Sequence, residues 1–182
     1  MEEKIERLRL WHQDGREHFV DVVFSSPNQS VAVLGAYYGG SCAGIEVGKR
    51  VALWSASYES PLLSDDGHTQ LGDGRIDLEI EALRGIGLGS LLMRPLVLWI
   101  KSRAASVPVV PIDLSADDAG TTRERDVRNR FYEKLGFEFA YSDQDRTWGA
   151  SLPMLSSALI LPAVQLSRGW IVDSVDGVGE VF

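Results

Sequence analysis

Three alternating glycines between an apolar segment and a helix-like segment restrict the fold of this chain more than any other feature. They lie in the stretch EIEALRGIGLGSLLM, at Gly85, Gly87 and Gly89. Glycine weakens regular structure, so such a cluster at a strand-to-helix junction indicates a sharp backbone turn or the close approach of another group. That group is most often an anion, because the first N–H groups of a helix lack acceptors and the helix dipole favours negative charge.

Two common phosphate-binding loops do not fit this turn. The P-loop requires a lysine before its Ser or Thr, whereas Ser90 follows Gly89 directly. The dinucleotide-binding fingerprint requires G-x-G-x-x-G, whereas the spacing here is G-x-G-x-G. The remaining pattern is Arg84-x-x-Gly87-x-Gly89, directly after a predicted strand and directly before a predicted helix.

The segment TTRERDVRNRFYEKLG, residues 121–136, predicts the clearest helix of the chain. Thr121 and Glu124 have the spacing of a capping box, and Gly136 suits the carboxyl-terminal stop. Three apolar residues recur every four positions and are expected to face the core: Val127, Phe131 and Leu135.

Other segments predict a sheet and a second helix. Residues 30–57 favour strands joined by glycine-rich turns, as in an antiparallel meander. Residues 76–81 alternate isoleucine and leucine with acids, which is typical of a strand with unlike faces. We also expect a helix over 90–105 that Pro95 bends, a strand near 107–116, a strand pair within 137–155 and a loop over 60–75. The first 24 residues fit either a helix or a strand, and the tail from Ser156 shows no clear period.

Composition restricts the setting and the partners. The length of 182 residues, 45% of them apolar, suits a single domain over residues 1–182. A net charge of −8 argues against binding to nucleic acid or to an anionic membrane. The single cysteine cannot form an internal disulfide, and the chain does not open on a signal-like segment, so a cytoplasmic setting is expected. No apolar run reaches the roughly 18 residues that suggest a membrane-spanning helix.

The ordered pair of motifs resembles the GNAT superfamily of acyl-CoA-dependent N-acyltransferases. In that family an [Arg/Gln]-x-x-Gly-x-[Gly/Ala] turn opens the central helix, and RFYEKLGFEF resembles the later helix and strand that carry a Tyr-x-x-x-Gly-Phe pattern. The resemblance covers about residues 75–140 and implies an α/β fold, a mixed, mostly antiparallel sheet flanked by helices. It also implies that the turn binds the pyrophosphate of acetyl-CoA, the acyl donor, through seven residues: Arg84, Gly85, Ile86, Gly87, Leu88, Gly89 and Ser90.

The family's chemistry assigns two catalytic candidates. Acyl transfer from a thioester to an amine needs a polarised carbonyl, a neutral amine and a proton for the leaving thiolate. The resemblance places Tyr132 as the acid, since a phenol keeps its proton at neutral pH. Glu79, on the acidic face beside the turn, is our candidate base, with Glu81, Asp77 and water as alternatives. Each candidate also has a structural interpretation: a packed ring for Tyr132, and a solvated sheet face for the acids.

The resemblance implies N-acetyltransferase activity on a primary amine of a small molecule, peptide or protein. A non-catalytic acyl-CoA-binding or protein-interaction module of the same fold is one alternative, and a toxin-type enzyme acetylating aminoacyl-tRNA is another. The acidic balance counts against RNA unless four arginines line one groove: Arg123, Arg125, Arg128 and Arg130. Arg125 also stands where the family often has Asn. The scattered histidines predict no metal site, and the oligomeric state stays open, a homodimer included.

Overall fold

A four-stranded antiparallel meander opens the chain. The computed structural model describes residues 2–62, 67–72, 78–103, 105–118 and 120–175. The meander strands are β1 (Glu2–His12), β2 (Glu17–Ser26), β3 (Val31–Gly40) and β4 (Arg50–Tyr58). Two short strands extend it to six in the order β5-β4-β3-β2-β1-β9, where β5 is Thr69–Leu71 and β9 is Trp170–Ser174. The first 24 residues, which fit either a helix or a strand by sequence, therefore form strands.

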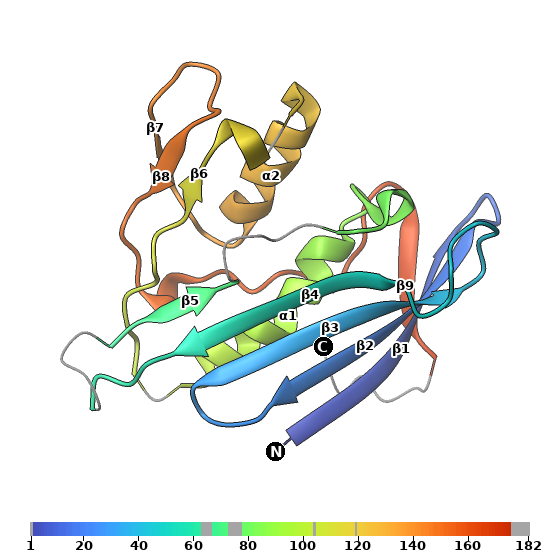
Figure 1. Ribbon diagram of the computed structural model, residues 1–182, viewed down its shortest axis with the longest axis horizontal. Coiled ribbons are helices and arrows are strands. Elements are labelled where there is room, and N and C mark those ends of the chain that lie inside the picture. Colours follow the sequence, from blue (N-terminus) through green and yellow to red (C-terminus); the bar gives the residue numbers. More distant parts are fainter. Residues whose placement is uncertain (1, 63–66, 73–77, 104, 119, 176–182) are drawn as a thin grey trace.

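Alternation along these strands builds one buried face. Val22 on β2 and Leu34 on β3 are fully buried, and Leu34 lies opposite Trp54 on β4. This face packs on α1 (Leu88–Lys101), whose apolar residues are buried on most sides. Figure 1 shows α1 behind the sheet, with the opposite face of the sheet toward the viewer. The predicted second helix is thus confirmed with shifted bounds, and it continues through Pro95.

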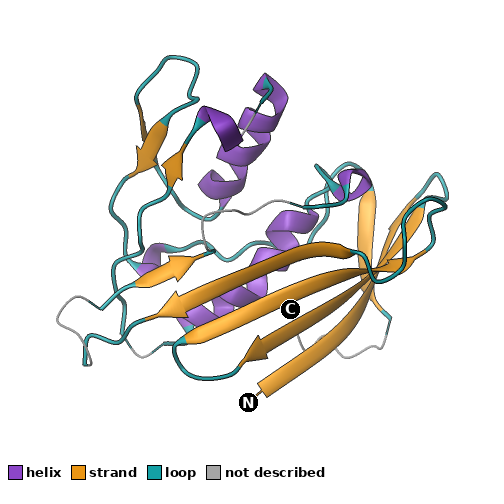
Figure 2. Cartoon of the chain, viewed as in Figure 1, coloured by secondary structure: helices purple, strands orange, loops and turns teal. Residues whose placement is uncertain are grey.

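A smaller layer stands beside the main sheet. It contains α2 (Thr122–Lys134) and a sheet ordered β6-β8-β7, formed by β6 (Asp113–Leu114), β7 (Phe139–Tyr141) and β8 (Gly149–Ser151). Three short 3₁₀ helices complete the described elements: η1 (Glu81–Leu83), η2 (Ala116–Asp118) and η3 (Ser156–Ala158). Figure 2 shows α2 and this small sheet above the large sheet, so the molecule has a mixed α and β architecture.

The helix predicted over residues 121–136 is confirmed, together with its ends. Thr121 and Glu124 form the capping box, and Gly136 follows the helix at a φ of 96°. Leu135 is buried as expected, but Val127 is 47% exposed, so its predicted core position is wrong. The amino-terminal part of α2 projects beyond the large sheet (Figure 1), and only its carboxyl-terminal end reaches the core.

The strand predicted over residues 76–81 is not found. Residues 76 and 77 lie outside the described residues, 78–80 are irregular, and η1 begins at Glu81. The alternation of burial is nevertheless present, since Leu78 and Ile80 are buried and Glu79 is exposed. One bond, from the Glu79 N–H to the Val51 carbonyl at 2.9 Å, ties this segment to β4. The predicted loop over 60–75 was also partly wrong, because it contains β5.

The tail that lacked any period runs antiparallel along α1, and we call residues 156–170 the carboxyl-terminal strap. Near the end of α1, Lys101 donates to the carbonyls of Ser157 and Leu159, both at 2.8 Å. Midway, Arg94 donates to the Pro162 carbonyl at 2.6 Å. Figure 1 shows the strap crossing between β8 and β9. It ends beside the start of α1, where the glycines lie.

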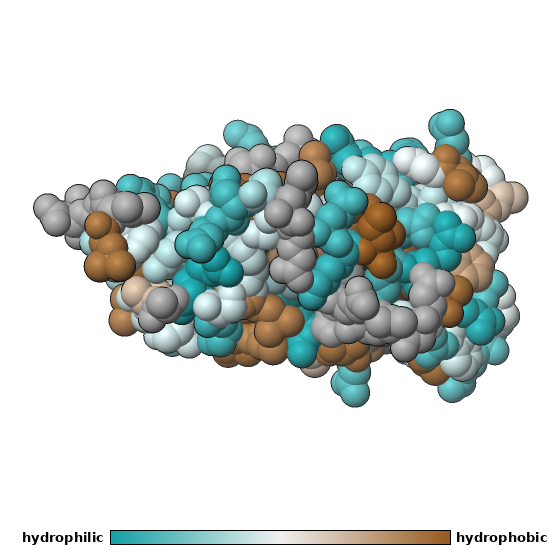
Figure 3. Space-filling model, turned by 90° about the horizontal axis from the view of Figure 1, so that it is seen from below, coloured by the Kyte–Doolittle hydropathy of each residue, from teal (hydrophilic) through white to brown (hydrophobic). Residues whose placement is uncertain are grey.

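The outward face of the large sheet carries a row of mostly apolar residues. Ile5 lies opposite Val23, Val23 opposite Gly35, and Gly35 opposite Leu53. Ile5 is 65% and Leu53 47% exposed, while the Tyr37 ring lies over Gly35. On the side of the molecule seen in Figure 3, hydrophobic residues form separate small groups among hydrophilic ones.

Candidate functional site

The glycine turn begins α1 as the sequence predicts. Gly87 caps the helix at a φ of 94°, and Gly85 has a φ of 73°, both in the left-handed region that favours glycine. Buried Leu83 and Ile86 fix the turn to the core. Successive N–H groups in a backbone of this kind form a concave arrangement that suits anions.

Four consecutive N–H groups of this turn have no acceptor among the described residues. They belong to Gly87, Leu88, Gly89 and Ser90, and no described residue accepts from them; the first bond of the helix runs from the Leu91 N–H to the Gly87 carbonyl at 3.2 Å. Unpaired backbone donors in folded proteins normally bond to water or to a ligand. The turn therefore offers several donors and the positive end of a helix dipole to an anion.

Close approach at Gly87 is made by the chain itself. A Cβ atom there would lie 3.3 Å from the Ser167 nitrogen and 3.4 Å from the Leu166 Cα. Gly89 differs, because its Cβ would make ordinary contacts of 3.7 Å to Phe131 and 3.8 Å to Trp54. The backbone and the strap thus account for Gly87, whereas neither requires glycine at position 89.

Two arginines flank the turn. Arg84 donates from Nε to the Leu78 carbonyl at 2.7 Å, so this predicted ligand also holds the segment before η1. The guanidinium of Arg168, in the strap, lies 3.5 Å from the position of a Cβ on Gly85. Arg168 is exposed, and its guanidinium has no hydrogen bond or ion pair to any described residue. Sequence reasoning missed it because it lies far along the chain in a segment without a motif.

Tyr132 lies one aromatic ring away from the start of α1. Phe131 contacts the Gly89 position and lies 6.3 Å from Trp54 between ring centroids. The Tyr132 ring is 5.2 Å from Phe131, 6.1 Å from Phe137 and also 6.1 Å from Phe139. The half-buried Tyr132 is thus fixed by packing on the side of α2 that faces α1.

Two strands part near β5 and leave a fork. Thr69 pairs in parallel with Val109: the Thr69 N–H donates to the Pro108 carbonyl at 2.9 Å, and the Val110 N–H to the Thr69 carbonyl at 2.8 Å. Beyond this point β5 stays in the large sheet, while β6 joins the small one. The connection between the two strands is α1, so this region is a parallel crossover unit whose strands diverge.

Glu79 lies at the end of β4 opposite to the end that pairs with Thr69. Its carboxylate forms an ion pair with Arg50 at the start of β4, and its side chain is 38% exposed. Thr69 pairs with Tyr58 at the other end of β4. The seven-residue step from Val51, which Glu79 contacts, to Tyr58 spans roughly 23 Å at the rise of a strand. Glu81 is exposed on η1, and Asp77 lies outside the described residues.

A histidine and a carboxylate meet at the other end of β5, on the side of the Thr69–Val109 bridge away from the fork. His68 immediately precedes Thr69, and its Nδ1 lies 3.3 Å from Glu59 Oε2. Neither a motif nor a regular spacing in the sequence links His68 to Glu59. The two residues meet because β4 and β5 pair, and this strand pairing cannot be recognised from the turn residues in the sequence.

The arginines of α2 do not line one groove. Arg128 donates to the Ser115 carbonyl and, at 3.0 Å, to the Thr147 carbonyl, so it ties α2 to the neighbouring segments. The Arg125 Nε is buried without a hydrogen bond, 3.6 Å from Asp126. Arg123 and Arg130 are exposed. Two of the four arginines are thereby withdrawn from the surface that RNA binding would need.

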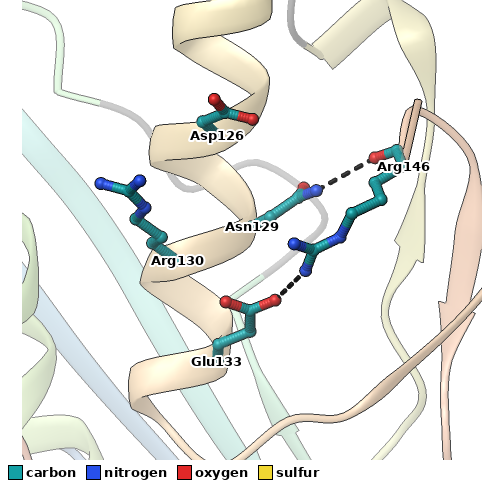
Figure 4. Close-up of a pocket in the computed structure, with 5 residues that line it drawn as sticks. All are labelled: Asp126, Asn129, Arg130, Glu133 and Arg146. Atoms are coloured by element: carbon teal, nitrogen blue, oxygen red, sulfur yellow. Dashed lines mark hydrogen bonds and ion pairs between the residues drawn. The ribbon is translucent and has the colours of Figure 1, made fainter. Parts of the chain in front are cut away.

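A polar pocket of about 170 Å³ lies on the far side of α2 from the aromatic residues. Figure 4 shows Glu133 and Arg146 joined by an ion pair, while Asn129 donates to the Arg146 carbonyl at 3.0 Å and Arg130 points away. Asp126 completes the lining. These interactions hold the turn after β7 against α2.

A buried group of polar aromatic residues anchors the end of the strap. His18 Nδ1 lies 3.0 Å from the Tyr38 hydroxyl, and the His18 ring stacks on Trp170 at 5.4 Å. The His12 ring lies 5.5 Å from the Trp170 ring, and the Arg16 guanidinium lies 5.2 Å over Trp170. Burial lowers the pKa of His18, and the charge of Arg16 lowers that pKa further.

We predict that His18 makes the protein less stable in mild acid. Above about pH 6.5 the residue is neutral in both states; as pH falls below this value, the unfolded chain binds a proton that the folded chain does not, until the lower folded pKa is reached. Urea unfolding of wild type and His18→Gln between pH 7 and pH 5 measures this difference. A His18→Gln protein whose stability falls as steeply as that of wild type would contradict it.

Comparison with protein-family models, with curated proteins and with solved structures found no match. Within the described ranges, no group of three or more His, Cys, Asp or Glu side chains is placed to hold a metal ion. None of the helices in the described part of the chain is long and apolar enough to cross a membrane.

Proposed function

We propose that this chain is an acyl-CoA-dependent N-acetyltransferase of the GNAT type. The proposal is carried by the N–H groups from Gly87 to Ser90 at the start of α1, which no described residue accepts from and which lie within the family's Arg-x-x-Gly-x-Gly pattern. These donors suit the pyrophosphate of acetyl-CoA. The parting of β5 and β6, with α1 as the crossover, agrees with the mixed sheet of that fold.

The reaction would proceed by direct attack. The amine nitrogen bonds to the thioester carbonyl carbon, the carbon–sulfur bond breaks, and the thiolate takes a proton from Tyr132. The proton lost by the amine goes to a base or to water. Glu79, which pairs with Arg50, remains our candidate for that base. His68, which Glu59 contacts, is a second candidate, although it lies on the side of the Thr69–Val109 bridge away from the fork. The acceptor is a primary amine of a small molecule, peptide or protein, and the exposed thiol of Cys42 suits the cytoplasmic setting that we propose.

A binding and turnover experiment tests the proposal against the silent-binder alternative. Calorimetry measures the affinity of the purified protein for acetyl-CoA, and a thiol reagent measures CoA release with a panel of primary amines. Binding with amine-dependent CoA release is the expected result. Binding without release would favour a non-catalytic acyl-CoA module, and the absence of both would contradict the proposal.

Arg168 provides a more specific prediction. Its φ of 58° lies in the left-handed region, which Asn adopts more readily, so Arg168→Asn should fold at least as well as wild type while losing the charge beside Gly85. If Arg168 contacts the pyrophosphate, acetyl-CoA should bind about tenfold more weakly, since hydrogen bonds to charged groups contribute about 1.5–3 kcal/mol. Arg168→Lys keeps the positive charge, so calorimetry should show an affinity for acetyl-CoA close to that of wild type. Equal affinity of Arg168→Asn and wild type would exclude Arg168 from the site.

A further inference from the structure

The end of the strap is bonded to one side of the glycine turn. The Ser167 N–H donates to the Ile86 carbonyl at 2.7 Å, and the Ser167 hydroxyl donates to the Gly85 carbonyl at 3.3 Å. These contacts join residues about 80 positions apart in the chain. The first bond acts on the peptide group that contains the Gly87 N–H, and the second acts on the peptide group before it.

Because a peptide group is planar, the bond to the Ile86 carbonyl also fixes the direction of the Gly87 N–H. In a trans peptide, the carbonyl of one residue and the N–H of the next point in opposite directions within one plane. The peptides of this chain are trans wherever they are described. A strap that holds the Ile86 carbonyl therefore aims the Gly87 N–H away from the strap. Gly87 is also the residue with a φ of 94°, where the backbone has few internal restraints.

The strap itself is held by hydrogen bonds and ring packing on both sides of Ser167. Before it, Arg94 and Lys101 of α1 fasten the strap carbonyls. After it, the Trp170 N–H returns to the Ser167 carbonyl at 3.2 Å across a turn with positive φ at Arg168 and Gly169. Trp170 is 6% exposed, with His18 stacked against it. Ser167 is thus positioned by groups outside the turn that it contacts.

We propose that Ser167 is a positioning residue: its N–H, held in place by the strap and Trp170, orients the Gly87 N–H toward the acyl-CoA pyrophosphate. This inference rests on the proposed function for the identity of the ligand. The strap then contributes to acetyl-CoA binding without touching it, and the glycine turn depends on a segment that its own motif does not include. The effect should appear in the affinity and the KM for acetyl-CoA, with kcat nearly unchanged.

Paired substitutions at Ser167 test the role of its N–H. Ser167→Pro removes the donor, whereas Ser167→Ala keeps it and removes only the longer hydroxyl contact. We expect Ser167→Ala to bind acetyl-CoA within a few fold of wild type and Ser167→Pro to bind about tenfold more weakly, the order of effect of one hydrogen bond to a charged group. A folded Ser167→Pro protein with wild-type affinity and KM would overturn the proposal.

A second pair covers the case in which Ser167→Pro does not fold. A Cβ on Gly169 would lie 2.8 Å from His12 Nε2, and that ring is held by the Arg168 carbonyl at 3.1 Å and by Trp170. Gly169→Ala should therefore break the contacts of His12 with the strap and displace the strap, whereas Gly15→Ala has a comparable φ of 91° with nothing within 4 Å. Amide spectra of the ligand-free proteins then report on the turn. We expect the Gly87 and Gly89 resonances to shift or broaden in Gly169→Ala and to stay unchanged in Gly15→Ala.

The ligand-free spectra separate the two proposals. If the wild type does not bind acetyl-CoA, the proposed function fails, and the spectra still decide whether the strap orders the turn. Unchanged Gly87 and Gly89 resonances in Gly169→Ala would refute the positioning role whatever the ligand. Changed resonances together with weaker acetyl-CoA binding in Gly169→Ala, but not in Gly15→Ala, would support both.

Discussion

Tyr132→Phe should lower kcat by about 10²- to 10⁴-fold, the usual contribution of a general acid, with little change in acetyl-CoA affinity. The Tyr132 ring packs on Phe131, Phe137 and Phe139, and phenylalanine keeps all of these ring contacts. Stability should therefore stay close to that of wild type. The expected loss lies in the chemical step, because phenylalanine lacks the hydroxyl that would donate the proton to the leaving thiolate. Initial rates on the best amine acceptor, with calorimetry of acetyl-CoA, measure both quantities.

Tyr141 provides a matched control for this substitution. Its ring also packs on Phe139, at 5.8 Å, but its hydroxyl accepts from Arg146 at 2.9 Å on the side of α2 that carries the polar pocket. Tyr141→Phe should leave kcat unchanged. If Tyr132→Phe also turned over at the wild-type rate, another group or water would protonate the sulfur, and Tyr132 would have a packing role only.

Local signals predicted the two motif-bearing elements well. The capping box of Thr121 and Glu124 and the stop at Gly136 act within one or two turns of α2, so the sequence alone specifies the helix ends. The left-handed conformations of Gly85 and Gly87 are equally local. The orientation of α2 relative to the sheet is not local, which is why Val127 was wrongly placed in the core.

In the segment before the glycine turn, residues 78–80, the side chains are buried in alternation although the backbone forms no strand. The alternation around Glu79 correctly predicted which side chains are buried, because burial depends on the face that each residue presents. Strand pairing depends on the neighbouring chain, and there only the Glu79 N–H reaches β4. The alternating pattern could not reveal this, nor that the Glu79 carboxylate pairs with Arg50.

Long-range contacts explain why the sequence did not reveal the residues that we propose to act beside the glycine turn. The strap is irregular and held largely by carbonyl bonds to Arg94 and Lys101, so it has no hydrophobic period to recognise. Arg168 and Ser167 reach the glycine turn only through this path. In the same way, strand pairing and not sequence spacing brings His18 to Tyr38.

Gly87→Val should abolish most acetyl-CoA binding and also lower stability, for reasons that can be separated. Valine at a φ of 94° is strained by about 1–3 kcal/mol, and its Cβ would lie 3.3 Å from the Ser167 nitrogen. The strap must then move, and the branched side chain crowds the donors of the turn. We expect a Tm lower by roughly 2–12 °C and an acetyl-CoA affinity lower by more than tenfold.

Two glycine controls identify the origin of each effect. Gly15→Val has similar backbone strain at a φ of 91° but nothing within 4 Å, so it should lose stability and keep wild-type acetyl-CoA affinity. Gly89→Ala makes only ordinary contacts to Phe131 and Trp54 and gains about 0.5–1 kcal/mol of helix preference, so it should be at least as stable as wild type and still bind. Thermal unfolding and calorimetry on the three variants provide the comparison. A folded Gly87→Val protein that binds acetyl-CoA as wild type does would remove the pyrophosphate from this turn, and the glycine there would then serve only the backbone turn and the close packing of the strap.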